Sequence, residues 1–247
     1  MQIENLGPED FGRGTKKRLP ICFCLDVSGS MSGERMVKLN RALKVFVDTA
    51  KDNPEAASSA DVAIVTFGGY PEILKPMSQL GSSTMPTIQV REHSLTPMGE
   101  AIKIALNILE VRKNGYRDRG LKYFQPWLVL ITDGKPEGKN ADEEMESALA
   151  KLNEMERNRK IVVFNIGIDD EVDTDMLRRI SVLRPKPISI ESDDLSSLFK
   201  FLGSSSTQVI DGAMGTDSLY KEIVDPESRE AVSQKFIKID LDAYGDI

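Results

Sequence analysis

A group of oxygen-bearing side chains follows the first strongly apolar segment of the chain. The run LPICFCL (residues 19–25) leads directly into Asp26, Ser28 and Ser30 of the stretch DVSGSMS. One carboxylate and several hydroxyls can cap a helix, supply a nucleophile, or form part of a cage for a hard cation such as Mg²⁺. Taken alone, the stretch is most typical of a helix-capping turn, because Asp, Ser and Gly favour such positions.

Two other polar sites have ordinary explanations when each is taken singly. Thr96 precedes Pro97 in SLTPMGEAI, where it is expected to be the N-cap of a helix with Pro at its first position. Asp133 precedes Gly134 in LITDGKPEG, a common turn at the end of a strand. Ser32 is expected to cap the helix that begins near Gly33. The chemistry therefore depends on whether the fold brings these sites together.

The elements that must position these side chains alternate between strand and helix. Apolar runs typical of buried strands occur at residues 20–25, 62–67, 127–132, 161–166 and 187–190. Apolar residues at helical spacing lie between them, over residues 36–50, 98–109, 145–155, 176–180 and 195–202. This alternation predicts an α/β fold, a doubly wound three-layer sandwich with a mostly parallel sheet.

One connection is too short for a parallel crossover. After Phe67, GGYPEILKPM offers a tight turn and a further extended run, which predicts one antiparallel edge strand; Pro71 and Pro76 suit an edge. We expect a polar N-terminal arm over residues 1–17, the folded domain over 18–206, and a C-terminal extension over 207–247. For the extension, a docking element and disorder both remain open.

In open parallel sheets, ligands bind at the carboxyl ends of the strands, which places all the polar sites at one edge. The set Asp-x-Ser-x-Ser, Thr-Pro-x-Gly and Thr-Asp-Gly resembles the von Willebrand factor type A domain. The resemblance implies that the matching positions form its metal-ion-dependent adhesion site: Asp26, Ser28, Ser30, Thr96 and Asp133. It further implies Mg²⁺, with Mn²⁺ as an alternative, direct binding by the hydroxyls, and aspartates that often act through water. An Asp or Glu carboxylate of a protein partner would complete the coordination.

Longer stretches are similar to the bacterial TerY-like proteins, which are associated with tellurite-resistance and stress gene clusters. These stretches include ICFCLDVSGSMSGERM and the closing LSSLFKFLGSSST. The resemblance implies a non-enzymatic, Mg²⁺-dependent protein-interaction module, with a PP2C-type phosphatase and a protein kinase as candidate partners.

The composition argues against several other classes of protein. The net charge of −7 argues against a general nucleic-acid binder, which usually has a basic surface. No run approaches the roughly 18–20 apolar residues of a membrane span, and no secretory signal is visible, so a cytoplasmic location is expected. Cys22 and Cys24 are expected to be buried strand residues that form no disulfide. His93 is assigned no role.

Three alternative classes of protein fit the sequence less well. Aspartyl phosphatases also place an Asp after the first strand, but their general acid is a second Asp where this chain has Ser28. A nucleotide-binding domain lacks support because neither glycine-rich phosphate motif is present. A metal-free scaffold of the same fold is the third alternative, and the complete set of five ligand positions argues against it.

Overall fold

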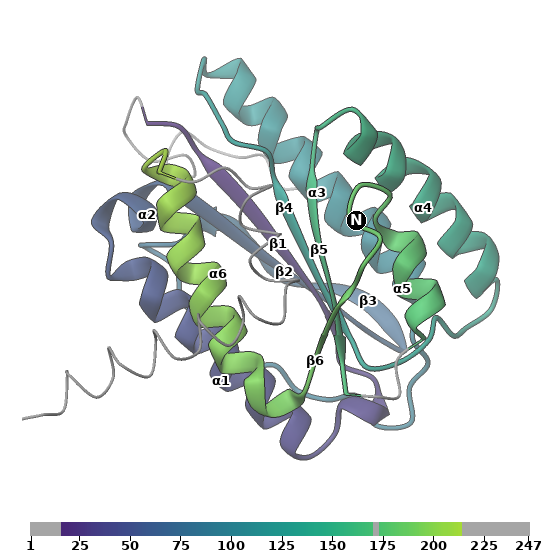
Figure 1. Ribbon diagram of the computed structural model, residues 1–247. Helices are drawn as coiled ribbons and strands as arrows, with labels where there is room; N and C mark the ends of the chain where they lie inside the picture. The colour runs from purple at the N-terminus through teal and green to yellow at the C-terminus, as the bar shows by residue number, and fades with distance from the viewer. Residues whose placement is uncertain (1–15, 170–172, 214–247) are drawn as a thin grey trace, which may run out of the picture.

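The computed structural model describes residues 16–169 and 173–213, which form a six-stranded sheet with helices on both faces (Figure 1). The strands follow the order β3-β2-β1-β4-β5-β6, and only β2 and β3 pair antiparallel. The α/β three-layer fold and its antiparallel edge strand are therefore confirmed. The strands are β1 (Leu19–Asp26), β2 (Ala60–Gly68), β3 (Tyr70–Gln79), β4 (Trp127–Thr132), β5 (Val162–Ile168) and β6 (Ile188–Ile190).

The helices divide into two layers. The described helices are α1 (Glu34–Lys51), α2 (Pro54–Ser59), α3 (Met98–Asp118), α4 (Ala141–Arg157), α5 (Thr174–Ile180) and α6 (Leu195–Ile210), with short 3₁₀ turns η2 (Gly29–Met31) and η3 (Ser192–Asp194). Helices α1 and α6 pack on one face of the sheet, and α3, α4 and α5 cover the other (Figure 1). Helix α2 is too short to show a clear apolar period, and the sequence did not predict it.

Strand β1 is buried along its whole length because it contributes to both cores. Phe23 points to the α1–α6 side, where its ring lies 5.0 Å from Phe46 and 5.6 Å from Phe199. Cys22 and Cys24 point to the other core, where both are fully buried free thiols. The prediction of two buried, unbridged cysteines is thus confirmed.

Two helix starts differ from the sequence prediction. Helix α3 begins at Met98 with Pro97 as its N-cap, so Thr96 is not the cap. Helix α1 has Gly33 as its N-cap, with φ at 72°, a conformation that glycine tolerates best. Ser32 instead ends the preceding 3₁₀ turn, where its N–H donates to the carbonyl of Gly29 (3.1 Å). The predicted capping roles of Thr96 and Ser32 were therefore wrong.

A cluster of buried charged residues lies at the end of the sheet where the parallel strands begin. Asp61, the second residue of β2, is fully buried and pairs with both Arg18 and Arg112. Tyr116 of α3 donates its hydroxyl to the same carboxylate. Removing one partner of such a buried pair typically costs about 3–5 kcal/mol. Over the described ranges, no helix combines the length and apolar character that crossing a membrane requires.

Candidate metal centre

The candidate site lies where β1 and β4 end side by side. The two strands are parallel neighbours, and Leu25 is in register with Ile131. Asp26 is the last residue of β1, and Asp133 follows the last residue of β4. In a sheet with this strand order, the gap between these two strands is the point where connections leave in opposite directions, and ligands bind there. The fold therefore positions both carboxylates at a general binding position.

The carboxylate of Asp26 is held by three hydrogen bonds. Its Oδ1 accepts from the backbone N–H of Ser28 (2.9 Å) and from the hydroxyl of Ser28 (2.6 Å). Its Oδ2 accepts from the hydroxyl of Thr132 (2.6 Å), the last residue of β4. Thr132 also accepts from the N–H of Gly134 (3.1 Å). The side chain of Asp26 is thus fixed between the two strand ends.

A continuous row of oxygen atoms extends from Asp26 to Asp133. The hydroxyls of Ser28 and Ser30 lie 3.1 Å apart, and Ser30 donates to Oδ1 of Asp133 (2.8 Å). Asp26, Ser28 and Asp133 are buried, whereas Ser30 is exposed. Four of the five residues predicted from the sequence are therefore joined directly by hydrogen bonds.

Thr96, the fifth predicted residue, is brought to the same edge by backbone contacts. Its carbonyl accepts from the N–H of Glu137, in the loop that follows Asp133 (2.9 Å). The segment before Thr96 is tied to the end of β1, because Arg91 donates its N–H to the carbonyl of Val27 (2.7 Å). Thr96 is itself buried, with 5% of its surface exposed.

Gly29 has a spatial role between the two serines. A Cβ atom at this position would lie 3.2 Å from the backbone nitrogen of His93, tighter than ordinary contact. The loop that carries His93 and Thr96 therefore packs closely on the Ser28–Ser30 turn. This contact is made by the backbone of His93.

Arg35 and Asp169, two charged residues that the sequence did not predict, lie next to Asp133 at the candidate site. Arg35, in the first turn of α1, donates from Nη1 to Asp133 Oδ2 (3.0 Å) and to the carbonyl of Ser30 (3.2 Å). Its Nε donates to Oδ2 of Asp169 (2.7 Å). Asp169 follows β5 directly, so the rule that selected Asp26 and Asp133 could have found it. Nothing in the sequence pattern pointed to Arg35.

The electrostatics of the two buried carboxylates favour a bound cation. The pKa of Asp26 is raised to about 6, mainly by burial and to a smaller extent by the charge of Asp133, against the hydrogen bonds from Ser28 and Thr132. Burial also raises the pKa of Asp133, although Ser30 and Arg35 counteract the effect. For Asp169, by contrast, the N–H of Ser192 and the charge of Arg35 outweigh burial and lower its pKa. A divalent cation would stabilise the charged forms of Asp26 and Asp133.

The donor types at this edge fit Mg²⁺. Hard cations take oxygen ligands, and Mg²⁺ is commonly held by one or two carboxylates together with water. Within the described ranges, no group of three or more His, Cys, Asp or Glu side chains is placed to hold a metal. The oxygen donors here would therefore be the hydroxyls of Ser28, Ser30 and Thr96, with the carboxylates of Asp26 and Asp133 acting directly or through water.

A family model for the von Willebrand factor type A domain matches residues 21–202, most of the chain. The chain belongs to this family, whose domains are generally metal-dependent protein-interaction modules. A comparison with curated proteins finds no match.

Solved structures support the same fold at low sequence identity. The von Willebrand factor domain of the type V pili tip protein Mfa5 from Porphyromonas gingivalis has a TM-score of 0.54 and 12% identity; 80% of this chain and 97% of that one are covered. The pilus adhesin SpaC from Lactobacillus rhamnosus GG has a TM-score of 0.58 and 12% identity, over 81% of this chain and 32% of that one. Proximal thread matrix protein 1 from the mussel byssus has a TM-score of 0.50 and 19% identity, over 76% of this chain. The match spans only 48% of the mussel protein's length.

Proposed function

We propose that Asp26, Ser28, Ser30, Thr96 and Asp133 bind Mg²⁺, with Mn²⁺ as an alternative, and that the chain is a non-enzymatic protein-interaction module. The observation that carries the proposal is the continuous row of oxygen atoms that joins Asp26 to Asp133 through Ser28 and Ser30. When bound, the ion would supply a centre of positive charge with a coordination position left for an Asp or Glu carboxylate of a partner protein.

The protein residues have distinct roles in this proposal. Ser28, Ser30 and Thr96 present neutral oxygens, which leave the ion electron-poor and receptive to an anionic ligand. Asp26 orients Ser28 by accepting its hydroxyl hydrogen bond, and Asp133 does the same for Ser30. The two aspartates thereby fix the geometry of the hydroxyls, as residues behind the direct ligands of a metal commonly do.

The phosphatase alternative is weakened by the geometry of Asp26. A nucleophilic carboxylate must reach the phosphorus atom of its substrate, but Asp26 is fully buried and accepts three hydrogen bonds. Ser28, at the position of the general acid in aspartyl phosphatases, is bonded to Asp26. The metal-free scaffold is disfavoured because the buried carboxylate of Asp26 would remain close to the charge of Asp133, while Arg35 pairs with Asp133 and Asp169.

The stretches ICFCLDVSGSMSGERM and LSSLFKFLGSSST support the narrower proposal of a TerY-like bacterial protein. On this proposal the chain acts in the cytoplasm within a tellurite-resistance or stress system, with a PP2C-type phosphatase and a protein kinase as partners. The proposed organisation is an arm over residues 1–17, the domain over 18–206 and an extension over 207–247. In the described residues, α6 continues to Ile210.

Calorimetric titration with Mg²⁺ and Mn²⁺ tests the metal site. Wild-type protein should bind one ion per chain, Asp26→Ala should bind none, and Ser32→Ala, a matched change outside the cage, should bind as wild type does. A cooperative thermal melt of Asp26→Ala would show that the fold is retained. Wild-type-like metal binding by Asp26→Ala would refute the assignment.

Partner binding has a separate test. Capture of the candidate phosphatase and kinase by wild-type protein should be lost in EDTA and in Asp26→Ala, but retained in Ser32→Ala. Capture that is insensitive to both changes would contradict a metal-dependent interaction. Hydrolysis of p-nitrophenyl phosphate that disappears in Asp26→Ala would instead support the phosphatase alternative.

A further inference from the structure

A basic cleft lies where strands β4 and β5 begin, at the opposite end of the sheet from the candidate metal centre. Its volume is about 510 Å³, and it is formed by the end of α3, the segment that leads into β4, and the turn after α4. Four cationic side chains line it: Lys113, Arg117, Arg159 and Lys160. Glu110, which is paired with Lys113, is the carboxylate in the lining. The cleft is thus strongly positive on a chain whose net charge is −7.

Aromatic side chains give the cleft an apolar part. Arg117 donates from Nε to the hydroxyl of Tyr123 (3.1 Å), and Lys17 lies 3.9 Å from the ring centre of Phe124. Neither Arg117 nor Lys160 forms an ion pair with a carboxylate in the part of the chain that the structure describes. Two cations are therefore available to an anionic ligand beside two aromatic rings.

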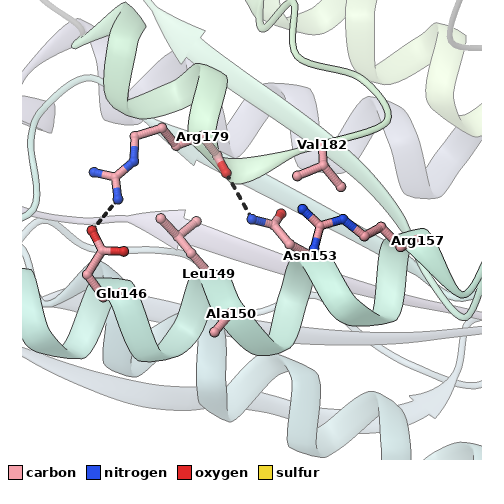
Figure 2. A pocket seen from close by; sticks show the side chains of 7 residues that line it. All are labelled: Glu146, Leu149, Ala150, Asn153, Arg157, Arg179 and Val182. Atoms are coloured by element: carbon pink, nitrogen blue, oxygen red, sulfur yellow. Dashed lines mark hydrogen bonds and ion pairs between the residues drawn. The ribbon is translucent and has the colours of Figure 1, made fainter.

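A second groove, between α4 and the end of α5, lacks this character. Figure 2 shows Arg179 pointing at Glu146, with which it forms an ion pair, and the amide of Asn153 pointing at the carbonyl of Arg179. The side chain of Leu149 lies between these two contacts, and Val182 lies on the side of Asn153 and Arg157 (Figure 2). Glu146 neutralises Arg179 here, and Arg157 is the further cation in the lining, so this groove attracts an anion less strongly than the basic cleft with its four cations.

The chain contains an acidic segment that complements the cleft. Residues 239–247, with the sequence IDLDAYGDI, hold three aspartates, no Lys or Arg, and the apolar or aromatic residues Leu241 and Tyr244. This segment lies outside the described residues. Its composition complements the cleft in charge, because its carboxylates can pair with the cations. It also complements the cleft in polarity, because its apolar side chains can pack on Tyr123 and Phe124.

The last described helix, which leads toward this segment, ends at the same end of the sheet as the cleft. Helix α6 ends beside α2, at the edge where β1, β4 and β5 begin (Figure 1). Because α6 and α3 lie on opposite faces of the sheet, the chain after α6 would pass around the beginnings of the strands to reach the cleft. An unstructured peptide with as many residues as 214–238 would have a typical end-to-end distance of roughly 25–30 Å. A tether of that reach would give an effective concentration in the millimolar range, at which weak binding would suffice.

We propose that the basic cleft binds an acidic peptide and that its occupant is the chain's own segment 239–247. The carboxylates of Asp240, Asp242 and Asp246 pair with the cations of the cleft, and Leu241 and Tyr244 pack on its aromatic rings. This binding site is independent of the candidate metal centre and of any metal.

Amide hydrogen exchange of the full chain tests the proposal. In wild type, the amides of 239–247 should exchange about 3- to 10-fold more slowly than in Asp240→Asn/Asp242→Asn/Asp246→Asn. The cleft variant Arg117→Glu/Lys160→Glu should lose this protection. Lys44→Glu/Lys151→Glu, which changes the charge equally on exposed surfaces outside the cleft, should keep it. Thermal melts of all variants control for the fold.

Two further measurements test whether the segment itself, and within the same chain, occupies the cleft. Combining Arg117→Glu/Lys160→Glu with Asp240→Lys/Asp242→Lys should restore protection, because the charges are then exchanged across the contact. Equal exchange of the segment in wild type and in the Asn variant would overturn the proposal, as would failure of the exchanged pair. Protection that grows with protein concentration would also overturn it, in favour of binding between two copies.

Discussion

Arg35 and Asp133 form an ion pair at the candidate metal centre, with 3.0 Å between Nη1 and Oδ2. Asp133 is buried, whereas Arg35 keeps 23% of its side chain exposed. The same guanidinium also pairs with Asp169. A positive charge therefore lies beside one of the two carboxylates that are proposed to hold a cation.

Replacing Arg35 with glutamine should tighten Mg²⁺ binding by about 3- to 10-fold, or roughly 1 kcal/mol. The removed charge repels the ion and competes for Asp133, and its partial exposure limits the size of the effect. Calorimetric titration measures the change. Arg41→Gln, an exposed position on the same helix, should leave the affinity unaltered. Weaker binding by Arg35→Gln would show that Arg35 supports the site, and equal binding would show that its charge does not oppose the ion.

The raised pKa of Asp26 predicts how the stability of metal-free protein depends on pH. The pKa is about 6 in the folded state against an ordinary 3.8, so between these pH values the folded state holds a proton that the unfolded state releases. The contribution of Asp26 is therefore greatest below about pH 4 and is lost as pH rises through 6. The full change is about 3 kcal/mol.

Urea denaturation in EDTA at pH 4 to 7 measures this dependence. The free energy of unfolding of wild type, minus that of Asp26→Asn, should increase as pH is lowered from 7 to 4. Taking the difference removes the contributions of other titrating groups. Parallel pH profiles of the two proteins would show that the proton affinity of Asp26 does not change on folding.

Mg²⁺ binding should have the opposite pH dependence, because the metal requires the ionised carboxylate. Below pH 6, each unit of acidification should weaken binding by up to about tenfold, as a proton competes with the ion at Asp26. The rise in melting temperature caused by saturating Mg²⁺ should consequently be larger at pH 7.5 than at pH 5. A rise of equal size at the two pH values would exclude Asp26 from the site.

Gly99, in the first turn of α3, allows close contact with α4. A Cβ at this position would lie 2.6 Å from the backbone of Glu144 and Met145. Because backbone atoms cannot move aside cheaply, Gly99→Ala should cost about 3 kcal/mol and lower the melting temperature by about 6–12 °C. Gly134→Ala is the control, since no atom lies within 4 Å of its added Cβ. A melting temperature for Gly99→Ala within 2 °C of the Gly134→Ala value would mean that the helices separate easily.

The thiols of Cys22 and Cys24 should be unreactive in folded protein. Both are fully buried, and burial raises the pKa of each, so the reactive thiolate is scarce. Titration with a thiol reagent such as DTNB at pH 8 should label neither cysteine in buffer and both in guanidinium. Rapid labelling of the folded protein would reveal local opening of the sheet core around β1.

The sequence alone predicted the strands and helices whose buried residues form a clear apolar pattern. Strand β4 was predictable because residues 127–131 are all apolar, and its position placed Asp133 at the carboxyl ends of the strands. The start of α3 was not predictable, since Thr96 before Pro97 is an ordinary cap signal. Here the backbone of Thr96 instead bonds to the loop of Glu137. Arg35 was missed for a similar reason, because its contacts with Asp133 and Asp169 exist only once three strand ends have met.

The two outer strands restrict how the molecule can associate with other chains. Strand β3 carries Pro71 and Pro76, which lack an N–H to donate, and β6 has only three residues. The side chain of Lys75 folds back to donate to the carbonyl of Val62, so a charged group sits in the outer strand. Both sheet edges therefore make poor templates for an added strand, which should limit aggregation through backbone pairing. Side chains rather than backbone pairing should therefore make the contacts between this domain and other chains.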